Sequence, residues 1–267
     1  MKLFLNGAIL PLDEAFISPT DRGFALGDGL FETIRAAEAR PLRIRSHLTR
    51  LREGAKCLGI SLTLTDGELI NALGTTLEVN GLTEGVLRLT LSRGPAARGL
   101  LPPAHPHPTL LITAGPLPPP AAPARAAIAQ DVRRNEHSPL SRFKTLSYLD
   151  NVLARMEAER RGADEALLLN TAGRLAESTI ANLFLVIDGD VVTPPVSEGA
   201  LPGVMRADVM DRLGAATARL TLHDLAAASE AFLTNSLGIR PLIEVDGRPV
   251  GTGQMGPVTR RLMEDLG

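Results

Sequence analysis

A stretch in the middle of the chain, residues 115–123 (GPLPPPAAP), is dominated by proline. Proline has no backbone N–H and its ring clashes with a preceding helical turn, so this stretch cannot continue a helix or lie in a central strand. It predicts a stiff, extended connection. The 267 residues are enough to build a core on each side of it. We predict a small α+β domain over residues 1–114, a linker over 115–123 and a larger domain over 124–267.

The strand patterns come mostly in pairs that are joined by short turns. Asn-Gly at 6–7 and Asp-Gly at 188–189 and 246–247 each separate two apolar runs. These dipeptides tolerate the positive φ that a tight turn needs. Helical periodicity lies between such pairs, for example in residues 46–58 and 204–213. Hairpins alternating with helices predict an α+β fold rather than a doubly wound parallel sheet.

Charge and cysteine content limit the class of partner. The formal net charge of -2 provides no field that would attract nucleic acid or an acidic membrane surface, so we expect a small-molecule partner. Cys57 is the single cysteine, which excludes an intramolecular disulfide and fits a reducing compartment; its helical surroundings predict a packed core thiol. The amino-terminal residues lack a signal-peptide pattern, and no apolar run approaches twenty residues. We expect a soluble, cytoplasmic protein.

Two histidines are the obvious metal candidates. His105 and His107 lie in a proline-rich loop, and no third ligand follows at a usable spacing. A zinc site needs three or four protein ligands. We therefore predict no metal site.

Three charged residues have more than one interpretation. Lys144 precedes a segment in which apolar residues recur at helical intervals, at Leu149, Val152, Leu153 and Met156. Glu177 follows the next predicted hairpin, and Arg50 lies on the helix predicted from residue 46. Spacing alone favours a surface lysine at a helix start, a carboxylate after a hairpin and an exposed, solvated arginine.

The order of several fragments gives these residues a second interpretation. The fragments are DRGFALGDGLFET, SHLTRL, FKTLSYLDNVLAR, DEALLLNTAGRLAESTIANLF, GALPGVMR and FLTNS. Together they resemble the class IV aminotransferases, which are fold-type IV enzymes dependent on pyridoxal 5′-phosphate. The resemblance covers nearly the whole chain. It implies a two-domain fold with a small N-terminal α/β domain and a larger C-terminal domain built on a barrel-like mixed sheet. It also implies a homodimer.

The resemblance assigns the cofactor contacts residue by residue. Lys144 matches the lysine that bonds covalently to the cofactor, which requires a neutral amine, and an apolar pocket favours that form. Glu177 matches the carboxylate that pairs with the pyridine nitrogen, and Arg50 matches the arginine that binds the phosphate. The remaining cofactor-binding positions are Leu201 on the ring face, Gly203, Val204 and Met205 at a helix start that favours anions, and Asn235 and Ser236 in a second phosphate loop.

The substrate residues that the resemblance implies are Arg98 for a carboxylate, Phe31, and Thr33 as an assistant in proton transfer. Threonine at 33, methionine at 205 and the pair at 235–236 resemble the 4-amino-4-deoxychorismate lyases of the family. The alternative is an aminotransferase for D-amino acids or branched-chain amino acids with a 2-oxo acid acceptor. A binding protein without turnover is a further alternative, but binding alone has no need of both Lys144 and Glu177.

Overall fold

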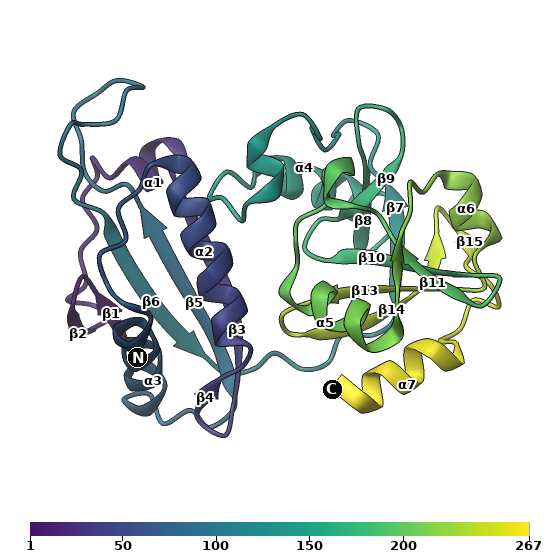
Figure 1. The fold of residues 1–267 in the computed structure, drawn as a ribbon, viewed down its shortest axis with the longest axis horizontal. Helices are drawn as coiled ribbons and strands as arrows, with labels where there is room; N and C mark the ends of the chain where they lie inside the picture. The colour runs from purple at the N-terminus through teal and green to yellow at the C-terminus, as the bar shows by residue number, and fades with distance from the viewer. Residues whose placement is uncertain (267) are drawn as a thin grey trace. The chain divides into compact units, whose positions relative to one another are not determined.

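The computed structural model describes residues 1–266 and divides into two compact units (Figure 1). The first unit comprises residues 1–119 and 143–147, and the second comprises residues 120–142 and those from 148 onwards. Lys144 therefore belongs to the first unit, although the chain on both sides of residues 143–147 belongs to the second. None of the helices in the described residues is long and apolar enough to cross a membrane.

The first unit is an antiparallel six-stranded sheet in the order β2-β1-β6-β5-β3-β4. Its elements are β1 (Lys2–Leu5), β2 (Ala8–Pro11), α1 (Arg22–Leu26), β3 (Gly29–Ala37), β4 (Arg40–Pro41), α2 (Ile44–Leu58), α3 (Asp66–Glu78), β5 (Gly85–Ser92) and β6 (Thr109–Gly115). α2 and α3 pack on the sheet and form its core (Figure 1). Leucines at 48, 51, 69, 73 and 77 are buried there, as the helical period of 3.6 residues requires.

Residues 143–147 extend the edge of β3 in the first unit. The backbone N–H of Phe31 donates to the carbonyl of Lys144 at 2.9 Å, and the N–H of Leu146 donates to the carbonyl of Gly29 at 2.9 Å. Gly29 leaves room for both of its neighbours: a Cβ there would lie 2.7 Å from Cδ1 of Leu146 and 2.4 Å from the carbonyl oxygen of Leu91 on β5. The backbone of Lys144 is thus fixed by strand-type pairing before the chain reaches its next helix.

The second unit is built on a nine-stranded mixed sheet. Its elements are β7 (Ala124–Ile128), η1 (Pro139–Arg142), α4 (Leu149–Arg160), β8 (Glu165–Leu169), β9 (Leu175–Ser178), β10 (Asn182–Ile187), β11 (Asp190–Thr193), η2 (Val196–Glu198), α5 (Val204–Leu213), β12 (Ala216–Thr217), α6 (Leu222–Ala227), β13 (Glu230–Asn235), β14 (Gly238–Val245), β15 (Arg248–Pro249) and α7 (Pro257–Leu266).

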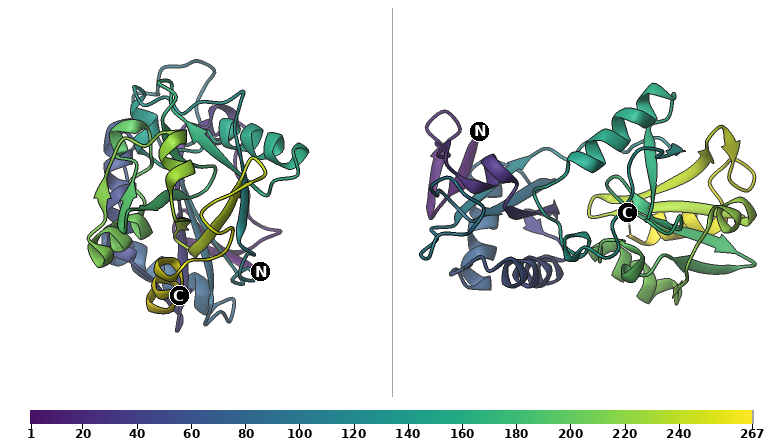
Figure 2. Two further views of the ribbon diagram at one scale, coloured as in Figure 1. Left: turned by 90° about the vertical axis from the view of Figure 1, so that its right-hand side faces the viewer. Right: turned by 90° about the horizontal axis from the view of Figure 1, so that it is seen from above.

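This sheet runs in the order β12-β11-β10-β13-β14-β7-β8-β9, with β15 paired to β14. The β11–β12, β14–β7 and β7–β8 pairs are parallel and the others are antiparallel. It curls into half a barrel, which confirms the predicted α+β class with a barrel-like mixed sheet in the larger domain. Phe184 and Phe232 face each other across β10 and β13 with their ring centroids 5.0 Å apart. α7 packs against β13 and β14 (Figure 2).

α4 shows an inversion of the usual helix pattern. Its buried residues include Ala154 and Ala158, which pack in one cluster with Ala127 of β7 and with Ala166 and Leu168 of β8. The residues at helical spacing, Leu149, Val152, Leu153 and Met156, are all exposed, with between 48% and 75% of their surface accessible. Small residues let the helix approach the sheet closely, while the large apolar stripe faces outwards.

Some local predictions were wrong. Cys57 is exposed, not packed in the core, because Leu51 and Ala55 already supply the inward face of α2 at this point. The apolar run at residues 126–132 predicts a strand there, whereas the strand β7 spans Ala124–Ile128 and so begins and ends earlier. The sequence reasoning also missed α1, capped by Asp21, and α6, capped by Thr221 and Asp224. Both caps follow the ordinary preference for a side-chain oxygen at a helix start.

Candidate active site

In the first unit, the amine of Lys144 lies over the ring of Phe31. The Nζ atom is 4.3 Å from the ring centroid. The guanidinium carbon of Arg88 on β5 lies 3.9 Å from the same centroid. An aromatic face attracts cations, so the ring gathers two basic groups at one place. The phenylalanine is itself buried, which provides an apolar surface beside the amine.

Thr33 lies on the same side of β3 as Phe31, because side chains two residues apart in a strand point to the same face. Its partner in the register of β5 is Arg88. The structure thus brings together four side chains of the first unit, three of them predicted as site residues. Arg88 is the one that sequence reasoning missed. Its signal was available as a basic residue in a strand that otherwise alternates apolar and small polar residues.

On the other side of β3, Glu32 is buried against α2. Arg50 donates from Nε to Oε1 of this carboxylate at 2.9 Å and from Nη2 to Oε2 at 2.5 Å. Nδ1 of His47 lies 2.7 Å from Oε2. Burial raises the pKa of the Glu32 carboxyl, but its bonds to His47 and Arg50 outweigh burial and hold the pKa below its usual value. The interpretation of Arg50 as a solvated arginine is wrong, since the carboxylate orients the guanidinium.

Arg98 is exposed in the loop between β5 and β6. The loop is anchored at the next two residues, where Arg22 donates to the carbonyls of Gly99 and Leu100, both at 2.8 Å. Arg22 is fixed in turn by Asp28, whose Oδ2 lies 2.7 Å from its Nε. Arg98 therefore sits on a braced segment, but the structure brings none of the other predicted site residues to it.

The same aspartate pairs with Arg93, whose Nε lies 2.7 Å from Oδ2. Burial raises the pKa of Asp28, and the hydrogen bonds and charges of Arg93 and Arg22 outweigh burial and lower it. Arg93, five residues before Arg98, is therefore a structural ion-pair residue.

In the second unit, Glu177 is buried at the carboxyl end of β9. Its Oε2 accepts from the N–H of Leu201 at 2.9 Å and from Nδ2 of Asn182 at 3.4 Å. Its Oε1 lies 3.1 Å from Nε of Arg134. Asn182 also donates to the carbonyl of Leu201 at 2.8 Å. A carboxylate that is held at both oxygens is fixed in orientation and stabilised in its charged form.

The amino terminus of α5 lies beside Asn182. Gly203 is its N-cap residue and supplies no side-chain cap, and a Cβ at this position would lie 2.0 Å from Oδ1 of Asn182. The next residues, Val204 and Met205, are buried and begin the helix. Backbone N–H groups in a first helical turn have no acceptor within the helix, and the helix dipole makes such a terminus favourable for an anion.

Two buried polar atoms of this unit lack a hydrogen-bond partner within the described residues. They are Nε of Arg206, in the first turn of α5, and Oγ1 of Thr234 on β13. Thr234 is the register partner of Asn182, and Asn235 and Ser236 follow it. Burial lowers the pKa of Arg206, although attraction to Glu177 acts in the opposite direction. Unsatisfied donors beside an uncapped helix start fit a bound anion such as a phosphate.

The predicted residues therefore fall into two groups. Within the first unit the structure brings together Lys144, Phe31 and Thr33, and it holds Arg50 on the core side of the same strand. Within the second unit Leu201 donates directly to Glu177, and the segment that begins α5 lies beside the same asparagine as β13. Sequence reasoning missed Arg134, Arg206 and Thr234 in this second group.

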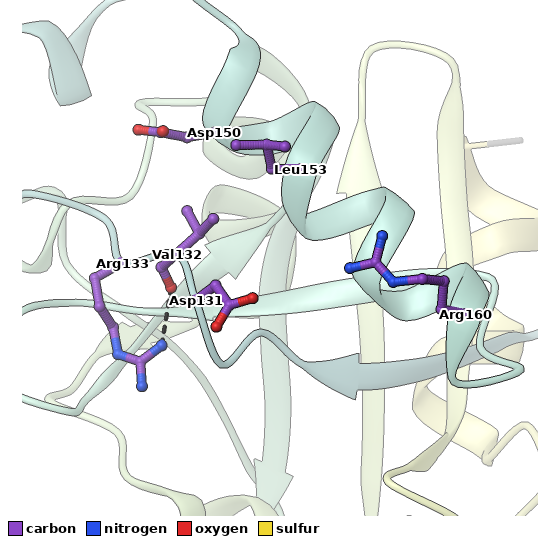
Figure 3. Close-up of a pocket in the computed structure, with 6 residues that line it drawn as sticks. All are labelled: Asp131, Val132, Arg133, Asp150, Leu153 and Arg160. Carbon is purple, nitrogen blue, oxygen red and sulfur yellow. Dashed lines mark hydrogen bonds between the residues drawn. The ribbon is translucent and has the colours of Figure 1, made fainter.

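A separate pocket of about 250 Å³ lies beside α4 (Figure 3). Asp150, Leu153 and Arg160 line it from the helix, and residues 131–133 line it from the loop that follows β7. Figure 3 shows Asp150, Leu153 and Arg160 on the helix and Asp131, Val132 and Arg133 on the facing loop, so that each side contributes acidic, basic and apolar side chains. None of the predicted site residues lines this pocket.

The comparisons with known proteins agree with this architecture. The family described as Amino-transferase class IV matches residues 29–245. A Methanocaldococcus jannaschii protein that bears the name of a branched-chain-amino-acid aminotransferase is 38% identical, over 99% of this chain and 94% of its own length. The Bacillus subtilis aminodeoxychorismate lyase is 31% identical, over 97% of this chain and 92% of its own.

A crystal structure of the Escherichia coli branched-chain amino acid aminotransferase superposes with a TM-score of 0.91 at 29% identity. The match covers 98% of this chain and 92% of that chain. The chain thus belongs to the class IV aminotransferase family, a family of enzymes that depend on pyridoxal phosphate. The resemblance found in the sequence is confirmed.

Proposed function

We propose that the protein is a pyridoxal-phosphate enzyme that converts 4-amino-4-deoxychorismate to 4-aminobenzoate and pyruvate. The observation that carries the proposal is the grouping of Lys144, Phe31 and Thr33 on one face of β3, with the lysine amine 4.3 Å from the ring. An amine and a hydroxyl on one face suit a reaction that takes a proton from one carbon and delivers it to another. The substrate atoms divide between the two products, so no co-substrate is needed.

The residues of the first unit have the following proposed roles. Lys144 holds the cofactor and then moves the proton of the carbon that bears the substrate amine. Thr33 assists the proton transfer, and Phe31 contributes to the substrate-binding surface beside the amine. Arg50, held by Glu32, supplies positive charge to the phosphate. Arg98 binds a substrate carboxylate, because a guanidinium matches carboxylate geometry.

The residues of the second unit bind the rest of the cofactor. When bound, pyridoxal phosphate supplies an electron sink for the carbon that loses its proton. Glu177 is proposed to pair with the ring nitrogen, and Leu201 to contact the ring face. Gly203, Val204 and Met205 offer N–H groups to the phosphate, together with Asn235 and Ser236. The unsatisfied Nε of Arg206 and Oγ1 of Thr234 support this assignment.

Reduction with borohydride tests the covalent role of Lys144. Incubation with pyridoxal phosphate followed by reduction should add the cofactor mass to the peptide that contains Lys144. Lys144→Gln should lose the added mass but keep its fold by circular dichroism. The matched control is Lys56→Gln, which removes an exposed lysine from α2 and should leave the labelling unchanged. Absence of label in the unmodified protein would falsify the cofactor assignment.

An aminotransferase is the second candidate function, favoured by the 38% identity to the M. jannaschii protein. Two parallel reactions separate the candidates. The lyase should release pyruvate and 4-aminobenzoate from 4-amino-4-deoxychorismate alone. An aminotransferase should instead require an amino donor, such as D-alanine or leucine, together with a 2-oxo acid. Transamination without release of 4-aminobenzoate would reject the lyase.

We also propose that the chain forms a homodimer through the apolar stripe on α4. Arg160 follows this stripe in the last turn of α4, and Asp150 lies in the first turn of the same helix. In an antiparallel contact about a two-fold axis, the arginine of one copy approaches the aspartate of the other. Arg160 and Asp150 therefore make this surface complementary to the same surface of a second copy, which favours a second copy as its binding partner.

A further inference from the structure

Arg134 lies beside Glu177 and makes a contact that sequence reasoning did not anticipate. Its Nε is 3.1 Å from Oε1 of the glutamate, and both side chains are largely buried, at 17% and 7% exposed. The opposite oxygen, Oε2, accepts from the N–H of Leu201. The guanidinium of Arg134 therefore contacts Oε1, and the N–H of Leu201 binds Oε2, so each carboxylate oxygen has its own partner.

The guanidinium cannot easily leave this position. Its Nε donates to the carbonyl of Gly199 at 3.1 Å, and its Nη2 donates to the carbonyl of Ser141 at 3.1 Å. The backbone of Arg134 is fixed as well, since its N–H donates to the carbonyl of Leu169 at 2.8 Å. Gly199 makes room for the side chain: a Cβ there would lie 3.2 Å from Cβ of Arg134. Both the backbone and the side chain of Arg134 are thus held by hydrogen bonds to surrounding carbonyl groups.

We infer that Arg134 is a positioning residue that keeps Glu177 ionised and fixes the orientation of its carboxylate. It thereby determines how strongly the protein prefers a cofactor ring with a protonated nitrogen over a ring without one. The inference rests on the proposed binding of pyridoxal phosphate.

The physical reason is the distance over which the two charges act. A neighbouring cation stabilises the carboxylate strongly because it is in direct contact. It repels a protonated ring nitrogen less, because the carboxylate lies between them and Coulomb energy falls with distance. The net effect favours a proton on the ring rather than on the glutamate. Without Arg134, a buried Glu177 would be more easily neutralised, and a neutral carboxyl gains less from a charged ring.

The test compares two ligands that differ only at the ring nitrogen. Full-length protein freed of cofactor is titrated with pyridoxal phosphate and with its 1-deaza analogue, in which a C–H replaces that nitrogen. Both ligands keep the aldehyde and the phosphate. The unmodified protein should bind pyridoxal phosphate more tightly. In Arg134→Met this preference should shrink by about tenfold, since an adjacent charge changes the proton affinity of a carboxylate by at least this factor. Arg134→Lys, which keeps the charge, should retain most of it.

The matched control is Arg155→Met, which breaks the contact of another arginine with a buried carboxylate, that of Glu165, at 3.1 Å in the same unit. It should leave the ratio of the two affinities unchanged. Equal losses for both ligands in Arg134→Met would mean that the arginine only supports the fold, and would overturn the inference. If Arg134→Met does not fold, Arg134→Gln carries the same comparison. Failure of the unmodified protein to bind either ligand would instead reject the proposed function.

Discussion

Arg50 and Glu32 form a buried two-point contact between α2 and β3, with Nε to Oε1 at 2.9 Å and Nη2 to Oε2 at 2.5 Å. The glutamate is 1% exposed, so its charge is compensated by protein groups rather than by water. The contact fixes the direction of a guanidinium that would otherwise sample many rotamers. Its removal should therefore affect both stability and phosphate binding.

Glu32→Gln should lower the free energy of unfolding by about 3–5 kcal/mol at pH 7, because it leaves a buried arginine without its counter-charge. The pKa of Glu32 is lower in the folded protein than in the unfolded chain. The stabilisation is therefore fully present above the unfolded pKa of about 4.3 and is lost as the pH falls through the folded pKa. Urea unfolding at pH 7 and at acidic pH should show the difference between variant and unmodified protein narrowing on acidification.

An exposed ion pair provides the control for this experiment. Nη1 of Arg212 lies 3.6 Å from Oδ2 of Asp265, and both side chains are more than 40% exposed. Arg212→Gln should cost about 1 kcal/mol or less. A comparable loss in the two variants would contradict the assignment of Glu32 as a buried, compensated charge.

Gly203→Ala should disturb the start of α5. The new Cβ would lie 2.0 Å from Oδ1 of Asn182, and this asparagine holds the carbonyl of Leu201. We expect a loss of about 1–3 kcal/mol from overpacking and weaker binding of pyridoxal phosphate. Gly74→Ala on α3 is the control: a Cβ there meets nothing within 4 Å, and a helix interior should gain about 0.5–1 kcal/mol. Thermal unfolding measures the change in stability, and cofactor titration measures the change in binding. If Gly203→Ala changes neither, the close contact between residue 203 and Asn182 does not restrict this position.

Leu153→Glu should separate the proposed dimer. The substitution places a charge in the middle of the exposed stripe on α4, where burial against a second copy would be strongly unfavourable. Light scattering coupled to size exclusion should report a dimer for the unmodified chain and a monomer for the variant. Leu222→Glu changes a comparably exposed leucine elsewhere in the second unit and should remain dimeric. A monomeric unmodified chain, or a dimeric Leu153→Glu, would rule out this surface.

Glu230→Gln should loosen α7. Oε1 of Glu230 accepts from the N–H of Val258 at 3.1 Å, and Oε2 accepts from the N–H and hydroxyl of Thr259 at 3.0 and 2.9 Å. A negative charge at a helix amino terminus contributes up to about 2 kcal/mol when partly buried. Hydrogen exchange should accelerate in α7 and not in α3. Unchanged exchange in α7 would show that packing alone holds this helix.

The predictions from sequence succeeded where a local rule decides the outcome. The Asn6-Gly7 turn, the helix that begins after Gly203 and the turn at Asp246-Gly247 follow from backbone preferences that need no tertiary contact. The stripe on α4 is the instructive contrast. Its period predicts a helix, but not which side is inward, because the alanines at 154 and 158 pack closely where larger side chains could not.

For the candidate site, the fragments in register identified residues but not their partners. Arg50 could be named from its position, whereas Glu32 and His47 become visible only when α2 packs on β3. Arg134 is separated from Glu177 by 43 positions in the chain, and no spacing rule connects them. Such pairs arise from tertiary proximity, which periodicity does not report.

The membership of residues 143–147 in the first unit means that the two units cannot be treated as interchangeable modules. The polypeptide joins them at three points, after residues 119, 142 and 147. A fragment that stops at the proline-rich stretch would lack the lysine and would leave part of the β3 edge without its hydrogen-bond partner. Recombination at that stretch would therefore exchange an incomplete unit. A hybrid joined at that stretch takes Lys144 from the parent of the second unit, whereas the β3 edge that holds the lysine comes from the parent of the first unit.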